Sequence, residues 1–156
     1  MSGLTDLRWH LIIAGVGPAE SEVRALFAPL AERVRWVGML DPVTLAKTYK
    51  ASDLYVWPAI KEAWGMALLE AQAAGLPVAA GRSGGVAGIV ADGETGLLSP
   101  EGDTAAFALS VRLLLADSER RAQMRRAADQ RTRREHDISA AAALLDQHIR
   151  ALVGRR

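Results

Sequence analysis

The sequence predicts an α/β fold: a Rossmann-like parallel sheet of about five strands, with flanking helices and a helical C-terminal tail. Short apolar runs alternate with amphipathic or Ala-rich stretches, which favours strands wound with helices. Glycine-rich turns follow most of the apolar runs. No further apolar run of strand type appears after residue 103, so the C-terminal third is expected to be helical throughout.

Each predicted element corresponds to one such segment. Strands are expected at residues 10–14, 34–37, 54–57, 77–80 and 96–98, and helices at residues 18–31, 43–50 and 64–74, with a short helical turn near 86–91. Pro18 suits the first position of its helix, and Asp41 followed by Pro42 is typical of a cap and a helix start. The glycines mostly follow strand C-termini, where open α/β sheets bind ligands.

The length of 156 residues and the hydrophobic content of 50% fit one domain with a substantial core. We expect its core at about residues 8–116 and its helical tail at about residues 117–153, with a break near Asp117 and a final helix over 138–153. That tail is expected to pack on the same sheet or on a chain outside this sequence. No cysteine is present, which excludes disulfides and thiolate metal sites, and the cytoplasm is the expected location. No apolar run approaches the ~20 residues that span a bilayer, and no signal-peptide pattern opens the chain.

Charge is distributed unevenly along the chain. Residues 1–111 contain eight Lys/Arg and twelve Asp/Glu, whereas residues 112–156 contain eleven and six. The basic residues of the tail suit a solvated helix face, or a surface that meets an acidic partner domain or anionic lipid at the membrane periphery. Nucleic acid is not an expected partner, because no aromatic residues are interleaved to stack on bases. The cluster consists of Arg120, Arg121, Arg125, Arg126, Arg131, Arg133 and Arg134.

The most informative segment for function is residues 62–70. A helix is expected to begin there, and the first turn of a helix exposes unpaired N–H groups that bind phosphate without a metal. Gly65 permits close approach of a ligand to the backbone. Glu70 lies about five residues into the helix, roughly 8 Å along its axis, so Glu62 and Glu70 can engage different hydroxyl-bearing parts of one ligand. The alternative is a capping acid at Glu62 and a solvated acid at Glu70.

Other motifs suggest other kinds of site, and each matches its pattern incompletely. Residues 81–85 match the nucleophile-elbow pattern around Ser83, but a helix following that serine would end within about two turns, at Asp92. The glycines of this loop more simply allow a close turn beside a phosphate or a neighbouring helix. Residues 15–20 begin like a dinucleotide fingerprint but lack its third glycine. The histidines lack paired spacing, so no metal site is predicted.

The four tryptophans fall into two groups. Trp9, Trp36 and Trp57 lie in or beside predicted strands and are expected in the core. Trp64 lies at the predicted ligand site, where it can pack on the ligand or on the helix start.

Several motifs in chain order carry a resemblance to a known family. Residues 56–78, VWPAIKEAWGMALLEAQAAGLPV, resemble the core of the retaining glycosyltransferases of family 4 (glycosyl transferases group 1). The similarity continues through residues 83–85, 89–90, 92–98 and 100–103 downstream, and through 11–18 and 34–38 upstream. The resemblance implies the C-terminal, donor-binding half of a GT-B fold, and with it a role in carbohydrate biosynthesis.

The resemblance also implies roles for individual residues. Glu62 is the implied catalytic residue, which contacts the donor sugar beside the reacting carbon, and Glu70 accepts hydrogen bonds from the ribose. No metal cofactor is implied. The remaining implied donor-binding residues are Trp64, Gly65 and Met66 for the diphosphate, Gly38, Met39 and Leu40 for the nucleobase, and Gly15 and Gly17 for the adjoining loop.

The implied parent reaction transfers a hexose from a nucleotide diphosphate sugar to a hydroxyl acceptor, with retained configuration. Relatives carry a basic pair and an acceptor-binding N-terminal domain ahead of this region, and no residue here matches either, so we expect a fragment or a shortened protein. Loss of two cations removes charge-assisted contacts of about 1.5–3 kcal/mol each. We therefore expect weak donor binding without turnover. The alternative is a non-catalytic nucleotide-sugar-binding or assembly module, completed by a partner chain or by self-association.

Overall fold

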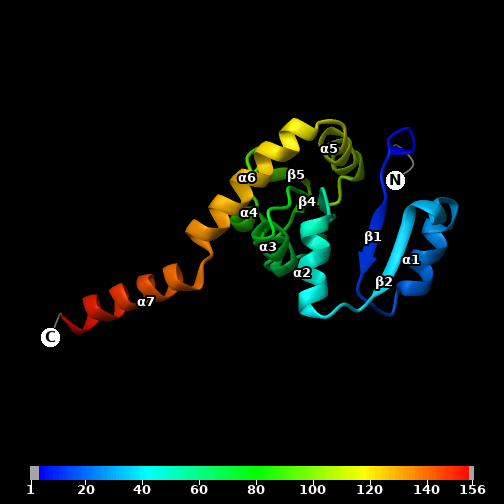
Figure 1. The fold of residues 1–156 in the computed structure, drawn as a ribbon. Coiled ribbons are helices and arrows are strands. Elements are labelled where there is room, and N and C mark those ends of the chain that lie inside the picture. Colours follow the sequence, from blue (N-terminus) through cyan, green and yellow to red (C-terminus); the bar gives the residue numbers. More distant parts are fainter. Residues whose placement is uncertain (1–3, 155–156) are drawn as a thin grey trace.

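The computed structural model describes residues 4–154 and confirms the α/β class with parallel strands, flanking helices and a helical C-terminal tail (Figure 1). All strand pairs are parallel. The strands are β1 (Leu11–Ala14), β2 (Val34–Gly38), β3 (Tyr55–Trp57), β4 (Val78–Arg82) and β5 (Gly96–Pro100).

The helices follow the predicted order and agree with most of the expected positions. Aspartates cap four of them: Asp41, Asp103, Asp117 and Asp137 each accept a backbone N–H of the first turn. The helices are α1 (Glu20–Phe27), the 3₁₀ helix η2 (Ala28–Arg33), α2 (Pro42–Ala51), α3 (Met66–Ala73), α4 (Val86–Ile89), α5 (Thr104–Ala116), α6 (Ser118–Glu135) and α7 (Ile138–Val153).

The predicted helix 18–31 is wrong at both ends. Pro18 lies in a turn ahead of α1, which begins at Glu20, and the α-helix ends at Phe27, where η2 begins. Pro29 lies in the first turn of η2. Because proline has no N–H and its ring clashes with the preceding turn, the α-helix cannot continue through it, and the chain tightens into 3₁₀ geometry.

The five strands form two sheets and not the single sheet that was predicted: β1 pairs with β2, and the second sheet has the order β3-β4-β5. The strand β4 has neighbours on both sides, and its residues Val78, Ala79 and Ala80 have no exposed area. The strand β1 is apolar throughout but pairs only with β2, and Ile12 remains 45% exposed. One edge of β1 and one edge of β3 therefore lack a partner strand within residues 4–154.

The core lies on both faces of the β3–β5 sheet. Consecutive residues of a strand point to opposite faces, so Val78 and Ala80 pack in one apolar cluster with residues of α3 and α4, while Ala79 packs in the other. The second cluster contains Val111 and Leu114 of α5 and extends to side chains of β1 and β2. Both sheets thus contribute to one apolar layer beneath α5.

The basic cluster of the tail is largely engaged within the chain. Arg121 donates to the carbonyls of Leu114 and Leu115 at the end of α5, at 2.6 and 2.9 Å, and Arg125 donates to the carbonyl of Ser52 at 2.9 Å. These guanidinium groups satisfy carbonyls at helix C-termini, which lack intrahelical partners. Ion pairs with acidic residues of α6 engage Arg131, Arg133 and Arg134.

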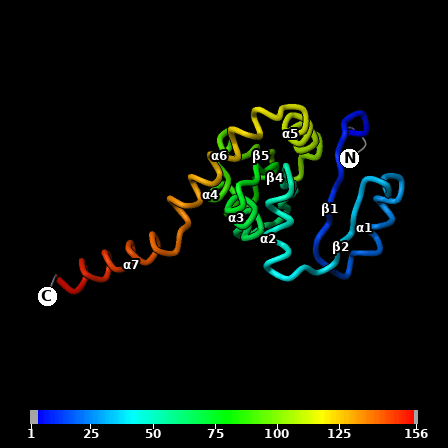
Figure 2. The backbone as a smooth tube through the Cα atoms, viewed as in Figure 1, coloured from blue at the N-terminus to red at the C-terminus, as the bar shows by residue number. Residues whose placement is uncertain are grey.

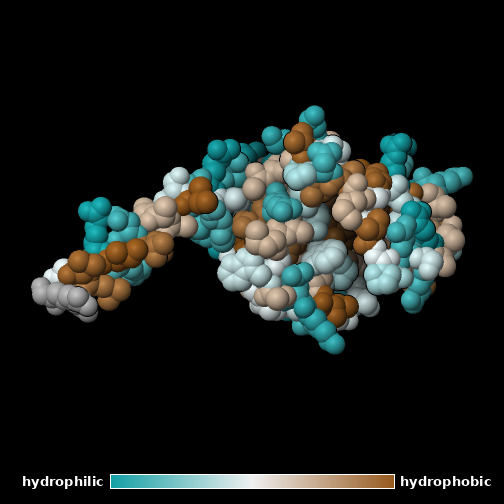
Figure 3. All heavy atoms as spheres, turned by 90° about the horizontal axis from the view of Figure 1, so that it is seen from below, coloured by the Kyte–Doolittle hydropathy of each residue, from teal (hydrophilic) through white to brown (hydrophobic). Residues whose placement is uncertain are grey.

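The two tail helices differ in their packing. Helix α6 lies against α3 and buries Met124 and Ala128. Helix α7 projects from the body and buries no residue (Figures 1 and 2). Apolar side chains lie along it (Figure 3), with Leu145 61% and Leu152 70% exposed. Within the part of the chain that is described, no helix is both long and apolar enough to cross a membrane.

Candidate functional site

The candidate site is built on the loop of residues 58–65, which joins β3 to α3. Two non-glycine residues of this loop, Ala59 and Lys61, have left-handed backbone angles, with φ of 50° and 54°. This conformation costs an L-residue about 1–2 kcal/mol, so packing around the loop must hold it. Ala59 is 2% exposed, and the Lys61 N–H donates to the Glu101 carboxylate at 2.7 Å.

The loop of residues 81–85 supports the site from behind. A Cβ at Gly81 would lie 2.0 Å from the Pro58 carbonyl oxygen, and a Cβ at Gly84 would lie 2.0 Å from that of Glu62. The N–H of Gly85 donates to the Ala63 carbonyl at 2.9 Å. These glycines were predicted to permit a close approach, and the segment that approaches them is the loop of residues 58–65.

Ser83 has a structural role in this support. Its side chain is 4% exposed, and its hydroxyl oxygen accepts the Glu62 N–H at 3.1 Å. Asp92, where the helix after this serine was predicted to end, pairs with Arg82 at 2.6 Å. This arrangement anchors the backbone of Glu62 and does not favour a nucleophile elbow.

The carboxylate of Glu62 has one engaged and one free oxygen. The indole N–H of Trp57 donates to its Oε2 at 3.1 Å. No hydrogen bond to its Oε1 is found within residues 4–154. Trp57 itself is 42% exposed, so its predicted place in the core is wrong: β3 is an edge strand, and this end of it lacks a neighbour on one side.

The helix after the loop begins later than predicted. Gly65, with φ of 92°, precedes the first helical residue Met66, so Trp64 lies outside the helix and the carboxylate of Glu62 does not cap it. The N–H groups of Trp64, Gly65 and Met66 donate no hydrogen bond within the described chain. They are unpaired donors of the kind that binds anions. The side chains of Trp64 and Met66 are 54% and 56% exposed.

Glu70 lies one turn further along α3, beside two tyrosines. The Tyr49 hydroxyl donates to Glu70 Oε2 at 3.5 Å, and both residues line a hollow of about 350 Å³ between α2 and α3. Burial, and then the Glu70 carboxylate, raise the pKa of Tyr49. Burial is also the main cause that raises the pKa of Tyr55, and the carboxylates of Glu70 and Glu62 both add to it. The Glu70 carboxylate therefore lies beside the Tyr49 phenol, on the side of α3 that faces α2.

The second group of predicted site residues lies at the C-terminal ends of β1 and β2. The N–H of Gly15 donates to the Gly38 carbonyl at 2.7 Å, and both glycines have positive φ. Gly17 and Met39 are exposed, Met39 by 76%, and Leu40 is half-buried. The two parts of the predicted site belong to different sheets, and no hydrogen bond within residues 4–154 joins this group to residues 62–70.

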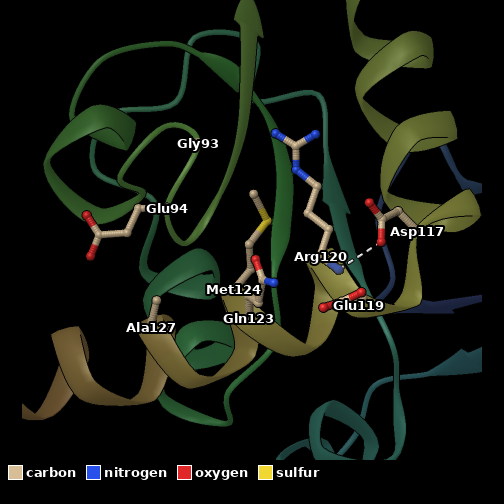
Figure 4. A pocket seen from close by; sticks show the side chains of 8 residues that line it. All are labelled: Gly93, Glu94, Asp117, Glu119, Arg120, Gln123, Met124 and Ala127. Carbon is tan, nitrogen blue, oxygen red and sulfur yellow. Dashed lines mark hydrogen bonds between the residues drawn. The ribbon is translucent and has the colours of Figure 1, made fainter.

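A larger hollow of the surface lies elsewhere. It measures about 670 Å³ and is lined from the turn before β5 and from α6, by residues that include Glu94, Asp117 and Gln123 (Figure 4). Asp117 already caps α6 through the Arg120 N–H at 2.8 Å (Figure 4). Residues 62–70 offer free backbone donors and two carboxylates and are therefore the candidate site, although Glu70 is the residue of this segment that lines the smaller hollow. No group of three or more acidic or histidine side chains within residues 4–154 is arranged to hold a metal ion.

Comparison with curated proteins and solved structures gives consistent matches. The D-inositol 3-phosphate glycosyltransferase of Acidothermus cellulolyticus is 35% identical over 156 residues, which covers 95% of this chain and 34% of the relative. The D-inositol 3-phosphate glycosyltransferase 2 of Catenulispora acidiphila is 37% identical over 123 residues, covering 79% and 29%. This chain thus spans about a third of these relatives.

The solved structures agree. Sucrose-phosphate synthase from Thermosynechococcus elongatus superposes with a TM-score of 0.82 at 31% identity, covering 94% of this chain and 39% of that one. Anabaena HepE, solved in complex with UDP-glucose, superposes with a TM-score of 0.78 at 21% identity, covering 91% and 41%, which shows a shared fold. The sequence profile of the family described as glycosyl transferases group 1 matches residues 2–131. The chain therefore belongs to the glycosyl transferases group 1 family, and its fold is that of a GT-B glycosyltransferase domain.

Proposed function

We propose that this chain is the donor-binding half of a retaining glycosyltransferase and that it binds a nucleotide diphosphate sugar at residues 62–70. In the proposed arrangement the free N–H groups of Trp64, Gly65 and Met66 hold the diphosphate, Glu70 accepts hydrogen bonds from the ribose, and Glu62 accepts one from the sugar. The parent reaction transfers a hexose to a hydroxyl acceptor with retained configuration. No metal is needed, because backbone N–H groups and the helix dipole supply the positive potential.

One observation carries this proposal. The start of α3 presents three unpaired N–H groups in a segment that begins with the carboxylate of Glu62 and ends with that of Glu70. Anion donors flanked by acceptors of hydroxyl hydrogen bonds suit a ligand with a charged centre and hydroxyl-bearing ends. The HepE complexes with UDP and UDP-glucose support the same ligand class by fold.

Catalysis by the isolated chain is expected to be negligible. The two loops of the site, residues 58–65 and 81–85, contain two cations, Lys61 and Arg82, and Arg82 is already paired with Asp92. A leaving diphosphate then lacks charge-assisted contacts, each about 1.5–3 kcal/mol. We expect saturable donor binding without turnover.

A second candidate is an assembly module that a partner completes. The edges of β1 and β3 that have no partner strand within residues 4–154 favour it, because their backbone N–H and C=O groups are open to another strand, and the side chain of Ile12 on β1 is 45% exposed. An extended segment of a partner chain or of an N-terminal domain can pair with such an edge. Ile12→Lys, which places a charge on this edge, is expected to abolish association with that segment and to leave donor binding unchanged.

The experiment that tests the proposed function is a calorimetric titration of the full chain with a panel of nucleotide diphosphate sugars. The expected result is saturable binding of at least one donor, and a loss of affinity of at least about fivefold in Glu70→Ala, because the ribose loses an acceptor. Glu94→Ala is the matched control, since Glu94 lies in the other hollow. Equal affinity in Glu70→Ala and Glu94→Ala would remove the ribose role. Turnover by the pure chain would contradict the expected inactivity.

A further inference from the structure

We propose that Trp57 is a positioning residue that orients the carboxylate of Glu62 for the sugar of the donor. The proposal rests on the donor site proposed above and adds a residue to it. The observation is the hydrogen bond from the Trp57 indole N–H to Glu62 Oε2 at 3.1 Å.

Trp57 is held by the sheet and not by the loop that it supports. It is the last residue of β3 and pairs with Ala80 of β4, whose side chain has no exposed area. The indole group is therefore attached to a rigid strand, five residues ahead of a carboxylate on a strained loop. A donor on a rigid element fixes the orientation of a flexible acceptor.

Burial does not explain the presence of this indole group. It is 42% exposed, and it belongs to neither apolar cluster of the core. Its hydrogen bond to Glu62 is the polar interaction that the structure gives it. The position of Trp57 is thus explained by the carboxylate and not by packing.

Glu62 is consequently held at two points. Its N–H donates to the buried Ser83 hydroxyl at 3.1 Å, and its Oε2 accepts from Trp57. The other carboxylate oxygen, Oε1, is left for the ligand. This arrangement presents one preorganised acceptor to a sugar hydroxyl, while the N–H groups of Trp64 to Met66 act separately on the diphosphate.

Because Glu62 acts on the sugar and the N–H groups of residues 64–66 act on the diphosphate, the two contacts can be measured separately. Removal of the Trp57 N–H lowers the additional affinity that the sugar contributes, and leaves the affinity for the nucleoside diphosphate alone unchanged. A general loss of structure would lower both affinities. The expected loss is about three- to tenfold in the ratio of the two affinities, the upper value being about 1.4 kcal/mol.

The test compares Trp57→Phe with the parent chain in calorimetric titrations. The probes are the nucleotide diphosphate sugar that the parent chain binds best and the corresponding nucleoside diphosphate. Two variants serve as controls that are expected to leave the ratio unchanged. Tyr49→Phe removes a donor from the other carboxylate, and Trp36→Phe removes an indole group that packs against Phe27 and Arg24.

A second measurement needs no ligand. The indole N–H resonance of Trp57, identified by its absence in Trp57→Phe, is expected to move in Glu62→Ala, while those of Trp9 and Trp36, which lie outside the site, stay in place. An unmoved resonance would overturn the proposed role of Trp57 without contradicting the proposed donor site. An unchanged ratio of affinities in Trp57→Phe would overturn it as well. If the parent chain binds sugar nucleotide and nucleoside diphosphate equally, the sugar contact of Glu62 itself is refuted.

Discussion

Alanine at Gly84 is expected to displace the loop that carries Glu62. The added Cβ would lie 2.0 Å from the Glu62 carbonyl oxygen and 2.9 Å from that of Ala63, and both atoms are backbone, which no side-chain rotation can move away. Gly84 also has a φ of 48°, which glycine adopts more readily than alanine. Both effects oppose the native position of the loop.

The magnitude follows from these two effects. A left-handed conformation costs a residue with a Cβ about 1–2 kcal/mol, and overpacking against a fixed neighbour costs typically about 1–3 kcal/mol. Gly84→Ala should therefore lower the free energy of unfolding by about 2–5 kcal/mol. Since the backbone of Glu62 must move, its bond to Ser83 is also strained, and donor affinity should fall by at least about tenfold, or about 1.4 kcal/mol.

Urea unfolding followed by tryptophan fluorescence measures the first effect, and calorimetric titration with a nucleotide sugar measures the second. Gly88→Ala is the matched control, because a Cβ there meets nothing within 4 Å and the residue lies in α4. That variant is expected to be as stable as the parent chain or slightly more stable. Equal unfolding free energies and equal donor affinities in the two variants would refute the role of the 81–85 loop as a support.

Three further predictions concern other parts of the chain. Thr95→Val should lower the free energy of unfolding by about 1–3 kcal/mol, because it leaves the buried Gln72 amide without the hydroxyl that it reaches at 2.7 Å; an unchanged urea midpoint would contradict this. Removal of residues 138–156 should leave that midpoint unchanged, since α7 buries no residue, and a lower midpoint would show that α7 packs on the body in solution. Glu70→Gln should lower the pKa of Tyr49 toward its ordinary value in an ultraviolet titration, because an anion that opposes the phenolate is removed. The raised pKa of Tyr49 contributes stability that is fully present below the ordinary pKa near 10 and is lost as the pH rises through the folded-state pKa. The Glu70→Gln variant should therefore lose less stability over this pH range than the parent chain. An unchanged pKa of Tyr49 in this variant would contradict the interaction between the two residues.

Much of the element order follows from local chemistry that a sequence displays. Apolar runs gave the five strands to within one or two residues, and Asp41 with Pro42 located the start of α2 correctly. The errors in the helix bounds lie at residues that suit more than one local conformation. Gly65 was expected within a helix but adopts a left-handed conformation, and α3 begins at Met66, two residues later than predicted.

The pairing of strands was beyond local reasoning. A sequence shows that a run is apolar but not which edge it meets, and β1 and β3 were both expected inside one sheet. The same limit explains Trp57, which was assigned to the core because it lies in a strand and is instead exposed at the edge. Its contact with Glu62 joins a strand end to a loop, and no periodic pattern marks such a contact.

The sequence indicated only part of the contacts that support the site. Three glycines within residues 81–85 indicated a close approach, and the structure identifies the approaching segment as the loop of Glu62. The position of Ser83 between glycines matched a catalytic motif. In the structure Ser83 is buried and accepts the Glu62 N–H, so it holds the backbone of Glu62 in place. The residue types were informative, whereas their partners required the fold.

The central claim is that a nucleotide diphosphate sugar docks where α3 begins. The most direct measurement is the change in backbone amide resonances of the full chain on titration with that ligand. We expect the largest changes at Trp64, Gly65 and Met66, whose N–H groups are unpaired. Changes confined to Gly93, Glu94 and Gln123, which line the larger hollow, would contradict it.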